Sequence, residues 1–91
     1  MNLKDFEYVK AVARYKHFRK AADACYVSQP TLSGQVKKLE QELGVVIFDR
    51  STKQVTLTVQ GEQLLKQITV ILEQTQVLKE IATSSHDPLK G

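Results

Sequence analysis

Residues 18–44 read FRKAADACYVSQPTLSGQVKKLEQELG, and this stretch decides the fold. Phe18–Cys25 carries apolar side chains at helical spacing, including the adjacent pair Ala21-Ala22. Side chains this small allow a second helix to cross closely. Tyr26-Val27-Ser28 is a tight connection, and a further helix continues to about Leu43. The stretch therefore predicts a helix-turn-helix.

The second helix of this pair begins near a proline and ends at a glycine. Pro30 fits the first helical turn and restricts the residue before it to extended angles, so either Ser28 or Gln29 can be the cap. Gly44 ends the helix. Its inward positions are Leu32, Val36, Leu39 and Leu43.

The flanking sequence predicts one more helix before this stretch. Leu3–Lys16 has Leu3, Phe6, Val9 and Ala13 at helical spacing, with Val12 on the flank. Asp5 and Glu7 in its first turn, and Arg14 and Lys16 in its last, suit the helix dipole.

After the stretch, a hairpin and a long helix are expected. Val45–Phe48 and Val55–Leu57 are predicted strands around the polar turn Ser51–Gln54. Thr58 can cap a helix over Val59–Thr83. The predicted fold is mainly α: a winged helix-turn-helix head (1–58) with a β-hairpin wing, a linker dimerisation helix (59–83), and a flexible exit (84–91).

Composition excludes several classes of protein. The 91 residues, 42% hydrophobic and 25% charged, suit one globular domain with a net charge of +3. Residues 1–54 hold ten basic and six acidic side chains, so the positive charge lies in the front half. Cys25, His17 and His86 are too few and wrongly spaced for a zinc site. We expect no enzyme activity, no cofactor, no metal and no membrane span, and an intracellular protein.

The outward positions of the helix after the turn have the chemistry of base and phosphate contacts. Gln29 can pair with adenine, and the methyl group of Thr31 can touch thymine. Gly34 destabilises a helix by roughly 1 kcal/mol relative to alanine. Its presence is explained either by close approach of the helix backbone to DNA or by tolerance of glycine on an exposed face. The residues predicted at the major groove are Ser28, Gln29, Pro30, Thr31, Ser33, Gly34, Lys37 and Lys38. Those predicted at the wing and DNA backbone are Arg50, Ser51, Thr52 and Lys53.

These residues also have simpler explanations. Lys37 and Lys38 could be a solvated helix face, and Ser28 could be only a cap. Cys25 fits a buried, inert thiol better than a redox site. A winged helix that docks another protein is the main alternative class, although the outward Gln, Thr, Ser and Lys side chains favour DNA.

Residues 64–82 contain an apolar repeat of alternating four- and three-residue spacing, which is typical of a coiled-coil seam. The predicted dimerisation residues are Leu64, Ile68, Ile71, Leu72 and Leu78. In a homodimer, a two-fold axis would relate the two helices that read DNA (the recognition helices, residues 29–43), and the pair would match an inverted repeat.

Residues 2–83 resemble the DNA-binding domain of LysR-type transcriptional regulators, most specifically over residues 21–50. The motifs that carry the resemblance are Val27-Ser28-Gln29-Pro30-Thr31-Leu32-Ser33, Glu42-Leu43-Gly44 and Phe48-Asp49-Arg50. The resemblance identifies residues 84–91 as the flexible start of a hinge to an absent effector domain. The resemblance implies contacts with DNA at Ser28–Thr31, Ser33, position 34, Thr52 and Lys53. It also implies binding to double-stranded promoter DNA with an interrupted dyad, dimerisation through the linker helix, and a location in the bacterial cytoplasm at the nucleoid. In a full-length protein it implies a tetramer, possible contact with RNA polymerase, and an effector domain beyond Gly91.

Two positions depart from the usual family pattern. Lys16-His17 replaces a small residue and serine, and Gly34 replaces the usual arginine, which puts one guanine or phosphate contact in doubt. Both departures resemble the peroxide-responsive branch of the family. A member that responds to a different effector is the alternative.

Overall fold

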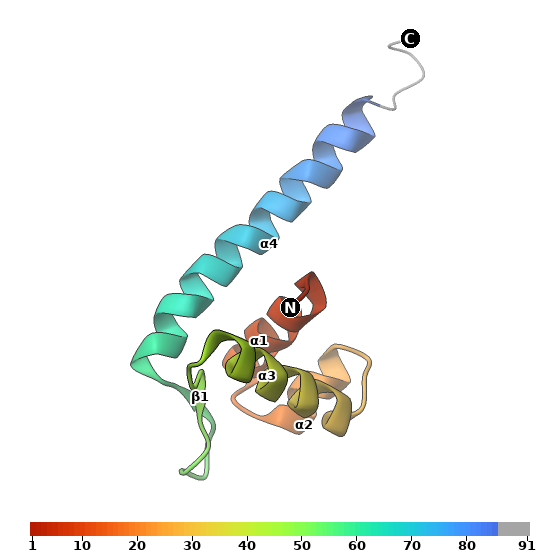
Figure 1. Cartoon of the computed structure of the whole chain (residues 1–91). Coiled ribbons are helices and arrows are strands. Elements are labelled where there is room, and N and C mark those ends of the chain that lie inside the picture. The colour runs from red at the N-terminus through yellow and green to blue at the C-terminus, as the bar shows by residue number, and fades with distance from the viewer. Residues whose placement is uncertain (86–91) are drawn as a thin grey trace.

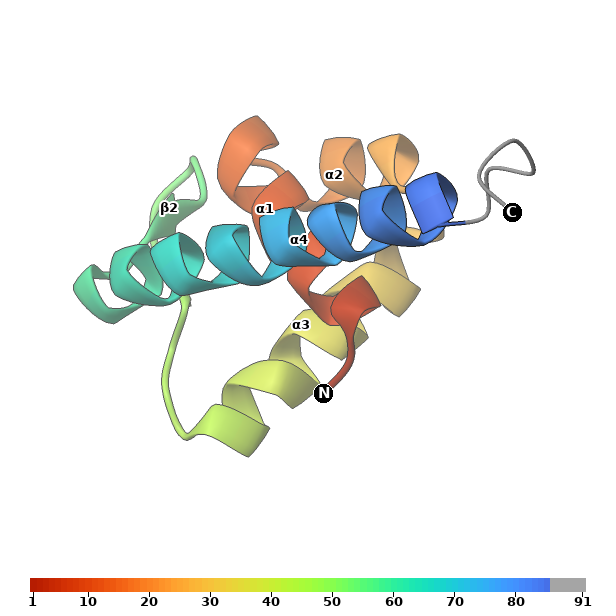
Figure 2. The ribbon, with the colours of Figure 1, turned by 90° about the horizontal axis from the view of Figure 1, so that it is seen from above.

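The computed structural model describes residues 1–85, which form four helices and one β-hairpin (Figure 1). In chain order the elements are α1 (Leu3–Tyr15), α2 (Phe18–Ala24), α3 (Gln29–Leu43), β1 (Phe48–Asp49), β2 (Thr56–Leu57) and α4 (Val59–Ser85). The first three helices form a head, the hairpin projects from it as a wing, and α4 crosses α1 and leaves the head (Figure 2). The predicted winged helix-turn-helix followed by a long helix is confirmed.

Each helix begins at a side chain that accepts a hydrogen bond from the backbone of its first turn. At α3 this cap is Ser28, and Gln29 is the first helical residue, which decides between the two candidates. The accepting side chains are Asn2, His17, Ser28 and Thr58, and the donors are the amides of Asp5, Lys20, Thr31 and Gly61.

The turn between α2 and α3 is made without glycine. Tyr26 adopts a left-handed conformation with φ of 59°, and it is 95% exposed. The amides of Tyr26 and Val27 donate to the carbonyls of Asp23 and Ala22, which holds the turn closed. Ala21 and Ala22 are buried beneath it. The predicted tight connection is confirmed.

The core of the head lies where the three helices meet. On α3, Leu32, Val36 and Leu39 are fully buried, as predicted. Leu43 is 38% exposed, so its predicted inward position is wrong. The reason is that the last turn of α3 extends beyond α1, as Figure 2 shows.

The buried face of α1 is rotated from the predicted one. Tyr8, Val9 and Val12 are buried, whereas Leu3 is 43% exposed and Ala13 is half-buried. Phe6 and Ala13 still pack partly against the core, but the helix is surrounded by α2, α3 and α4, which centre its buried surface on Tyr8 and Val12.

The wing is shorter than predicted. Its antiparallel register pairs Phe48 with Leu57 and Asp49 with Thr56. The strand expected over Val45–Phe48 is wrong for its first three residues, and the second strand begins at Thr56, one residue late. The carbonyl of Ile47 still accepts from the amide of Thr58, in the same register, but the ladder ends there because the Ile47 amide donates to the Glu40 carboxylate.

A glycine lets α4 start close to the head. Gly61 is buried, and a side chain there would run into the carbonyl group of Ile47. Further along, Ile68 is 4% exposed and belongs to the core. The helix ends at Ser85, two residues beyond the predicted Thr83. The rest of the predicted hinge, residues 86–91, lies outside the described residues.

Within residues 1–85, none of the helices combines the length and the apolar character needed to cross a bilayer. The same residues hold no group of three or more His, Cys, Asp or Glu side chains that could bind a metal ion.

Candidate nucleic-acid interface

One face of α3 gathers most of the predicted major-groove residues. Ser28, Gln29, Pro30, Thr31, Gly34, Lys37 and Lys38 are exposed, and Ser33 is half-buried. Helical spacing places Pro30, Gly34 and Lys37–Lys38 together, on the side of the helix away from its buried leucines and valine. The contacts of these residues with DNA remain a prediction. A helix that enters the major groove must expose its contact residues on one face, and the exposed residues of α3 meet this requirement.

The first turn of α3 is fixed by two hydroxyl groups. The Ser28 hydroxyl accepts from the amide of Thr31 and donates to the Thr31 hydroxyl at 2.8 Å. Ser28 is therefore a helix cap, and its contact with DNA stays a prediction. The Thr31 hydroxyl accepts this bond and retains its own proton as a donor, so Thr31 can also serve as a hydrogen-bond donor to DNA.

Gly34 has no packing role inside the chain. A Cβ atom built at this position meets nothing within 4 Å. The helix therefore carries the propensity cost of glycine, about 1 kcal/mol relative to alanine, with no compensating contact within the described residues. This agrees with a partner that approaches the backbone of α3 closely.

The tip of the wing is shaped by local hydrogen bonds. Ser51, Thr52 and Lys53 are all exposed, as predicted for a surface that contacts DNA. Hydrogen bonds from the Ser51 hydroxyl and amide hold the pKa of Asp49 below its usual value, so this carboxylate stays ionised. The Thr52 hydroxyl donates to the carbonyl of Gln54 at 2.7 Å.

Arg50 differs from the other wing residues because its guanidinium group is bound within the protein. It forms an ion pair with Glu40 at 2.9 Å, donates to the carbonyl of Phe48, and lies over the ring of Phe18 at 5.0 Å from its centroid. Its side chain is 41% exposed, so part of it still faces solvent beside the wing.

Glu40 is the residue that the sequence interpretation missed. It is 9% exposed and accepts hydrogen bonds from Ile47, Phe48 and Arg50. The available signal was its position four residues after Val36, on the inward stripe of the helix. A carboxylate placed there needs partners of its own.

The five predicted dimerisation residues do not share one environment. The predicted dimerisation role of Ile68 is corrected, because this side chain packs in the core of its own head and leaves little surface for a second chain. Leu64 and Leu72 also pack partly against that core, and Ile71 is half-buried. Leu78 is 66% exposed and stays available.

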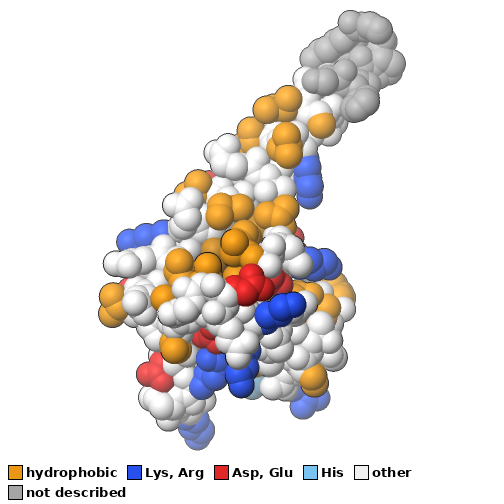
Figure 3. Space-filling model, viewed as in Figure 1, with side chains coloured by type: hydrophobic (Ala, Val, Ile, Leu, Met, Phe, Trp, Pro, Cys, Tyr) orange, Lys and Arg blue, Asp and Glu red, His pale blue; other side chains and the backbone are white. Residues whose placement is uncertain are grey.

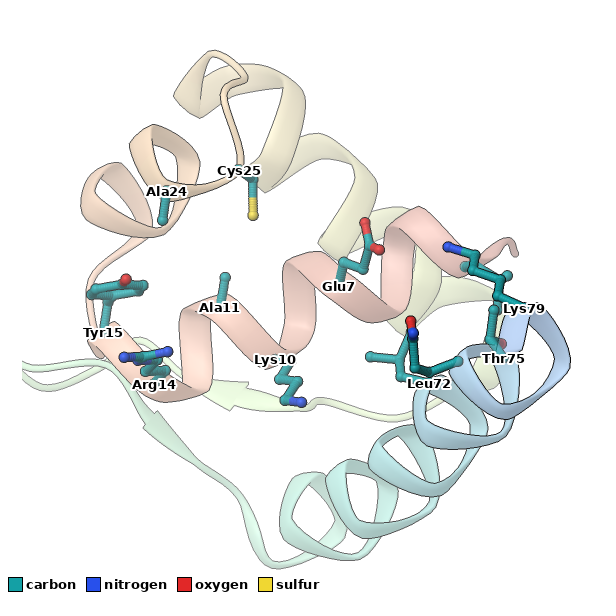
Figure 4. Close-up of a pocket in the computed structure, with 12 residues that line it drawn as sticks. Glu7, Lys10, Ala11, Arg14, Tyr15, Ala24, Cys25, Leu72, Thr75 and Lys79 are labelled. Atoms are coloured by element: carbon teal, nitrogen blue, oxygen red, sulfur yellow. The ribbon is translucent and has the colours of Figure 1, made fainter. Parts of the chain in front are cut away.

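A groove of about 510 Å³ separates α4 from α1 and the end of α2 (Figure 4). The Cys25 side chain points toward α1 from one wall, and Leu72 and Thr75 lie on the α4 wall. Burial raises the pKa of the Cys25 thiol, and the nearby Glu7 raises it further. A raised pKa disfavours the reactive thiolate that a redox site needs.

Basic and apolar side chains are distributed differently over the surface (Figure 3). Basic side chains gather low on the head beside the wing, whereas hydrophobic side chains follow α4 away from it (Figure 3). An exposed polar and basic reading helix beside an exposed hairpin is the architecture of a winged helix-turn-helix DNA-binding domain.

Comparison with known proteins gives the family. Residues 3–62 match the family described as "Bacterial regulatory helix-turn-helix protein, lysR family". The match covers more than half of the chain, and the chain belongs to this family. It is a LysR-type helix-turn-helix DNA-binding domain, as the motifs of residues 21–50 predicted.

Individual relatives and solved structures agree with this assignment. The chain is 54% identical over 65 residues to the "Hydrogen peroxide-inducible genes activator" of Haemophilus influenzae, which covers 71% of this chain and 22% of that protein. A full-length OxyR variant from Pseudomonas aeruginosa matches with a TM-score of 0.91 and 47% identity, over 96% of this chain and 30% of that one. A complex of the BenM DNA-binding domain with a benA site matches with a TM-score of 0.92 and 28% identity, over 97% and 99% of the two chains. The chain thus spans about a fifth of the length of the curated relatives it matches.

Proposed function

We propose that this chain is the promoter-binding domain of a hydrogen-peroxide-responsive transcription regulator of the OxyR type. The observation that carries the DNA-reading role is the exposed face of α3, on which polar and basic side chains surround a glycine with no packing role. The peroxide branch is supported by the resemblance to the "Hydrogen peroxide-inducible genes activator" and by the presence of Gly34 and Lys16-His17. A LysR-type regulator of another effector is the alternative.

In this proposal α3 enters the major groove with its first turn toward the bases. Gln29 pairs with adenine, and the Thr31 methyl group contacts thymine. Lys37 and Lys38 lie further along the helix and contact phosphates. The wing residues Ser51–Lys53 contact the backbone or the minor groove.

The proposal includes a homodimer formed through α4. Val70, Val77, Leu78 and Ile81 are 41–66% exposed and recur at i, i+7, i+8 and i+11, which places them on one face of the helix. Exposed apolar side chains that share one face of a helix are what a second copy can cover. Two heads joined in this way read two inverted half-sites in double-stranded promoter DNA.

The remaining functions belong to the parts of the full-length relatives that this chain does not cover. Peroxide sensing, tetramer formation and contact with RNA polymerase are assigned to that part. Cys25 is not assigned a sensing role, because its pKa is raised. The proposed location is the bacterial cytoplasm, at the nucleoid.

In vitro selection of duplexes from a random library, followed by fluorescence anisotropy, tests the proposal. Two enriched inverted half-sites about one or two helical turns apart are expected, because a two-fold dimer presents its reading helices with that spacing. The selected duplex should bind more tightly than its scrambled version, and both should weaken steeply with salt. Equal, weak binding to both duplexes would contradict sequence reading and favour the protein-docking class.

A further inference from the structure

The carboxylate of Glu40 connects three separate parts of the head. Its Oε2 atom accepts from the amides of Ile47 at 2.7 Å and Phe48 at 3.3 Å, where the chain enters the wing. Its Oε1 atom accepts from Arg50 Nη2 at 2.9 Å, where the chain leaves β1. Glu40 itself lies on α3, so one side chain joins the reading helix to both ends of the first wing strand.

The guanidinium group of Arg50 extends this connection to α2. It donates to the Phe48 carbonyl at 3.2 Å and lies over the Phe18 ring, which itself meets the Phe48 ring edge-on at 6.0 Å. A planar guanidinium can satisfy a carboxylate, a carbonyl and an aromatic face together, and a lysine cannot. The position of the wing relative to α3 is therefore set by directional bonds as well as by apolar packing.

An apolar side chain could fill the place of Glu40 without the desolvation that a buried carboxylate requires. Hydrogen bonds with fixed directions, by contrast, specify where β1 starts and how it is oriented. The carboxylate is thus better explained by geometric specificity than by stability.

We propose that Glu40 and Arg50 are positioning residues for DNA recognition: their ion pair holds the wing in the one orientation that lets it contact DNA while α3 occupies the groove. This inference rests on the proposed wing contacts. Glu40 does not touch DNA itself, since it is buried and negatively charged.

Glu40→Gln gives an effect whose sign separates positioning from electrostatics. Removing a negative charge from a DNA-binding surface should by itself raise the affinity for DNA. Positioning predicts the opposite, a loss of roughly tenfold for the selected duplex, as expected for coupled groups. Glu42→Gln is the matched control: it removes the same charge from the same helix, but within residues 1–85 the Glu42 carboxylate bonds to the terminal amine of Met1 and not to the wing.

The salt dependence of binding gives a readout that a merely structural role would not move. In the wild-type chain, Lys53→Ala should lower the slope of log affinity against log salt by about one, because one phosphate contact is lost. In the Glu40→Gln background, the same substitution should change the slope very little, since the wing no longer reaches the DNA. Urea unfolding followed by circular dichroism establishes that each variant is folded under the binding conditions.

Each outcome decides a different part of the inference. If Lys53→Ala leaves the wild-type slope unchanged, the proposed wing contact is wrong and the positioning role falls with it. If Lys53→Ala lowers the slope equally in both backgrounds, the wing contact stands and the positioning role alone is overturned. If Glu40→Gln does not fold, Arg50→Lys decides, because it keeps the charge but loses the guanidinium geometry: the effect of Lys53→Ala must shrink in that background.

Discussion

α3 and α4 each bury one face against the head, and their outward faces differ in chemistry. The outward face of α3 carries Gly34 and two lysines, with no large apolar side chain before its last turn. The outward face of α4 carries Val70, Val77, Leu78 and Ile81. A polar, cationic face can contact phosphates and base edges, whereas an exposed apolar face can be covered by another protein surface. In the proposed function, the two helices therefore separate DNA recognition from dimer formation within one short chain.

The largest effect is expected where the two helices are joined. Gly61→Ala places a methyl group against the Ile47 carbonyl, and because that neighbour is backbone, α4 must shift. We expect a loss of about 2–3 kcal/mol in the free energy of unfolding, in the range of overpacked sites. Urea denaturation measures it. A variant as stable as the wild type would show that α4 is not held closely to the head.

A charge on the outward face of α4 should break assembly without breaking the head. Leu78→Glu would bury a charge in the proposed dimer contact, at a cost of several kcal/mol to the dimer. Sedimentation should show monomers with an unchanged unfolding midpoint at high dilution. Gln76→Glu is the control, since it adds the same charge about 200° away around the helix. Dimers that persist in Leu78→Glu would remove this face from the assembly.

Removing the amide of Gln29 should affect reading and leave assembly intact. Gln29→Ala should cost about 1–3 kcal/mol on the selected duplex and relax the base preference at one position of each half-site. Anisotropy with the selected and scrambled duplexes measures both. An equal loss on the two duplexes would assign Gln29 to the DNA backbone.

The smallest expected effect is that of replacing Gly34 on the outward face of α3, where the stability of the fold and the affinity for DNA should change in opposite directions. Gly34→Ala should stabilise the fold by up to about 1 kcal/mol, since a Cβ meets nothing there and alanine favours the helix. The same methyl group should weaken DNA binding if the backbone of α3 approaches the DNA. Tighter folding with unchanged DNA affinity would favour the tolerated, exposed glycine.

Local signals predicted the helices of the head well. Ser28, Pro30 and Gly44 each act through their own backbone neighbourhood, so the bounds of α3 follow from the sequence near them. The adjacent alanines predicted the close packing at the turn for the same reason. The exposed reading face follows from helical spacing once the buried positions are known.

Interactions between distant residues could not be predicted in this way. Val45–Ile47 has the composition of a strand, but the amides of Val45 and Ile47 donate to the carbonyl and the carboxylate of Glu40 on α3. The ion pair of Arg50 could not be predicted, because its partner Glu40 lies ten residues away on α3. On α4 the apolar repeat does not say which residues face the head, since that depends on how the helix is rotated against α1.

The peptide group between Ile47 and Phe48 has a mechanical consequence. Its N–H donates to Glu40 of α3 at 3.3 Å, and its carbonyl accepts from Thr58, the cap of α4, at 2.9 Å. One rigid plane is thus bonded to both helices. Ile68 packs in the core further along α4, so the helix is held to the head at two places about 15 Å apart. Two fixed places along one axis define a direction, and the peptide group together with Ile68 therefore sets the angle at which α4 leaves the head.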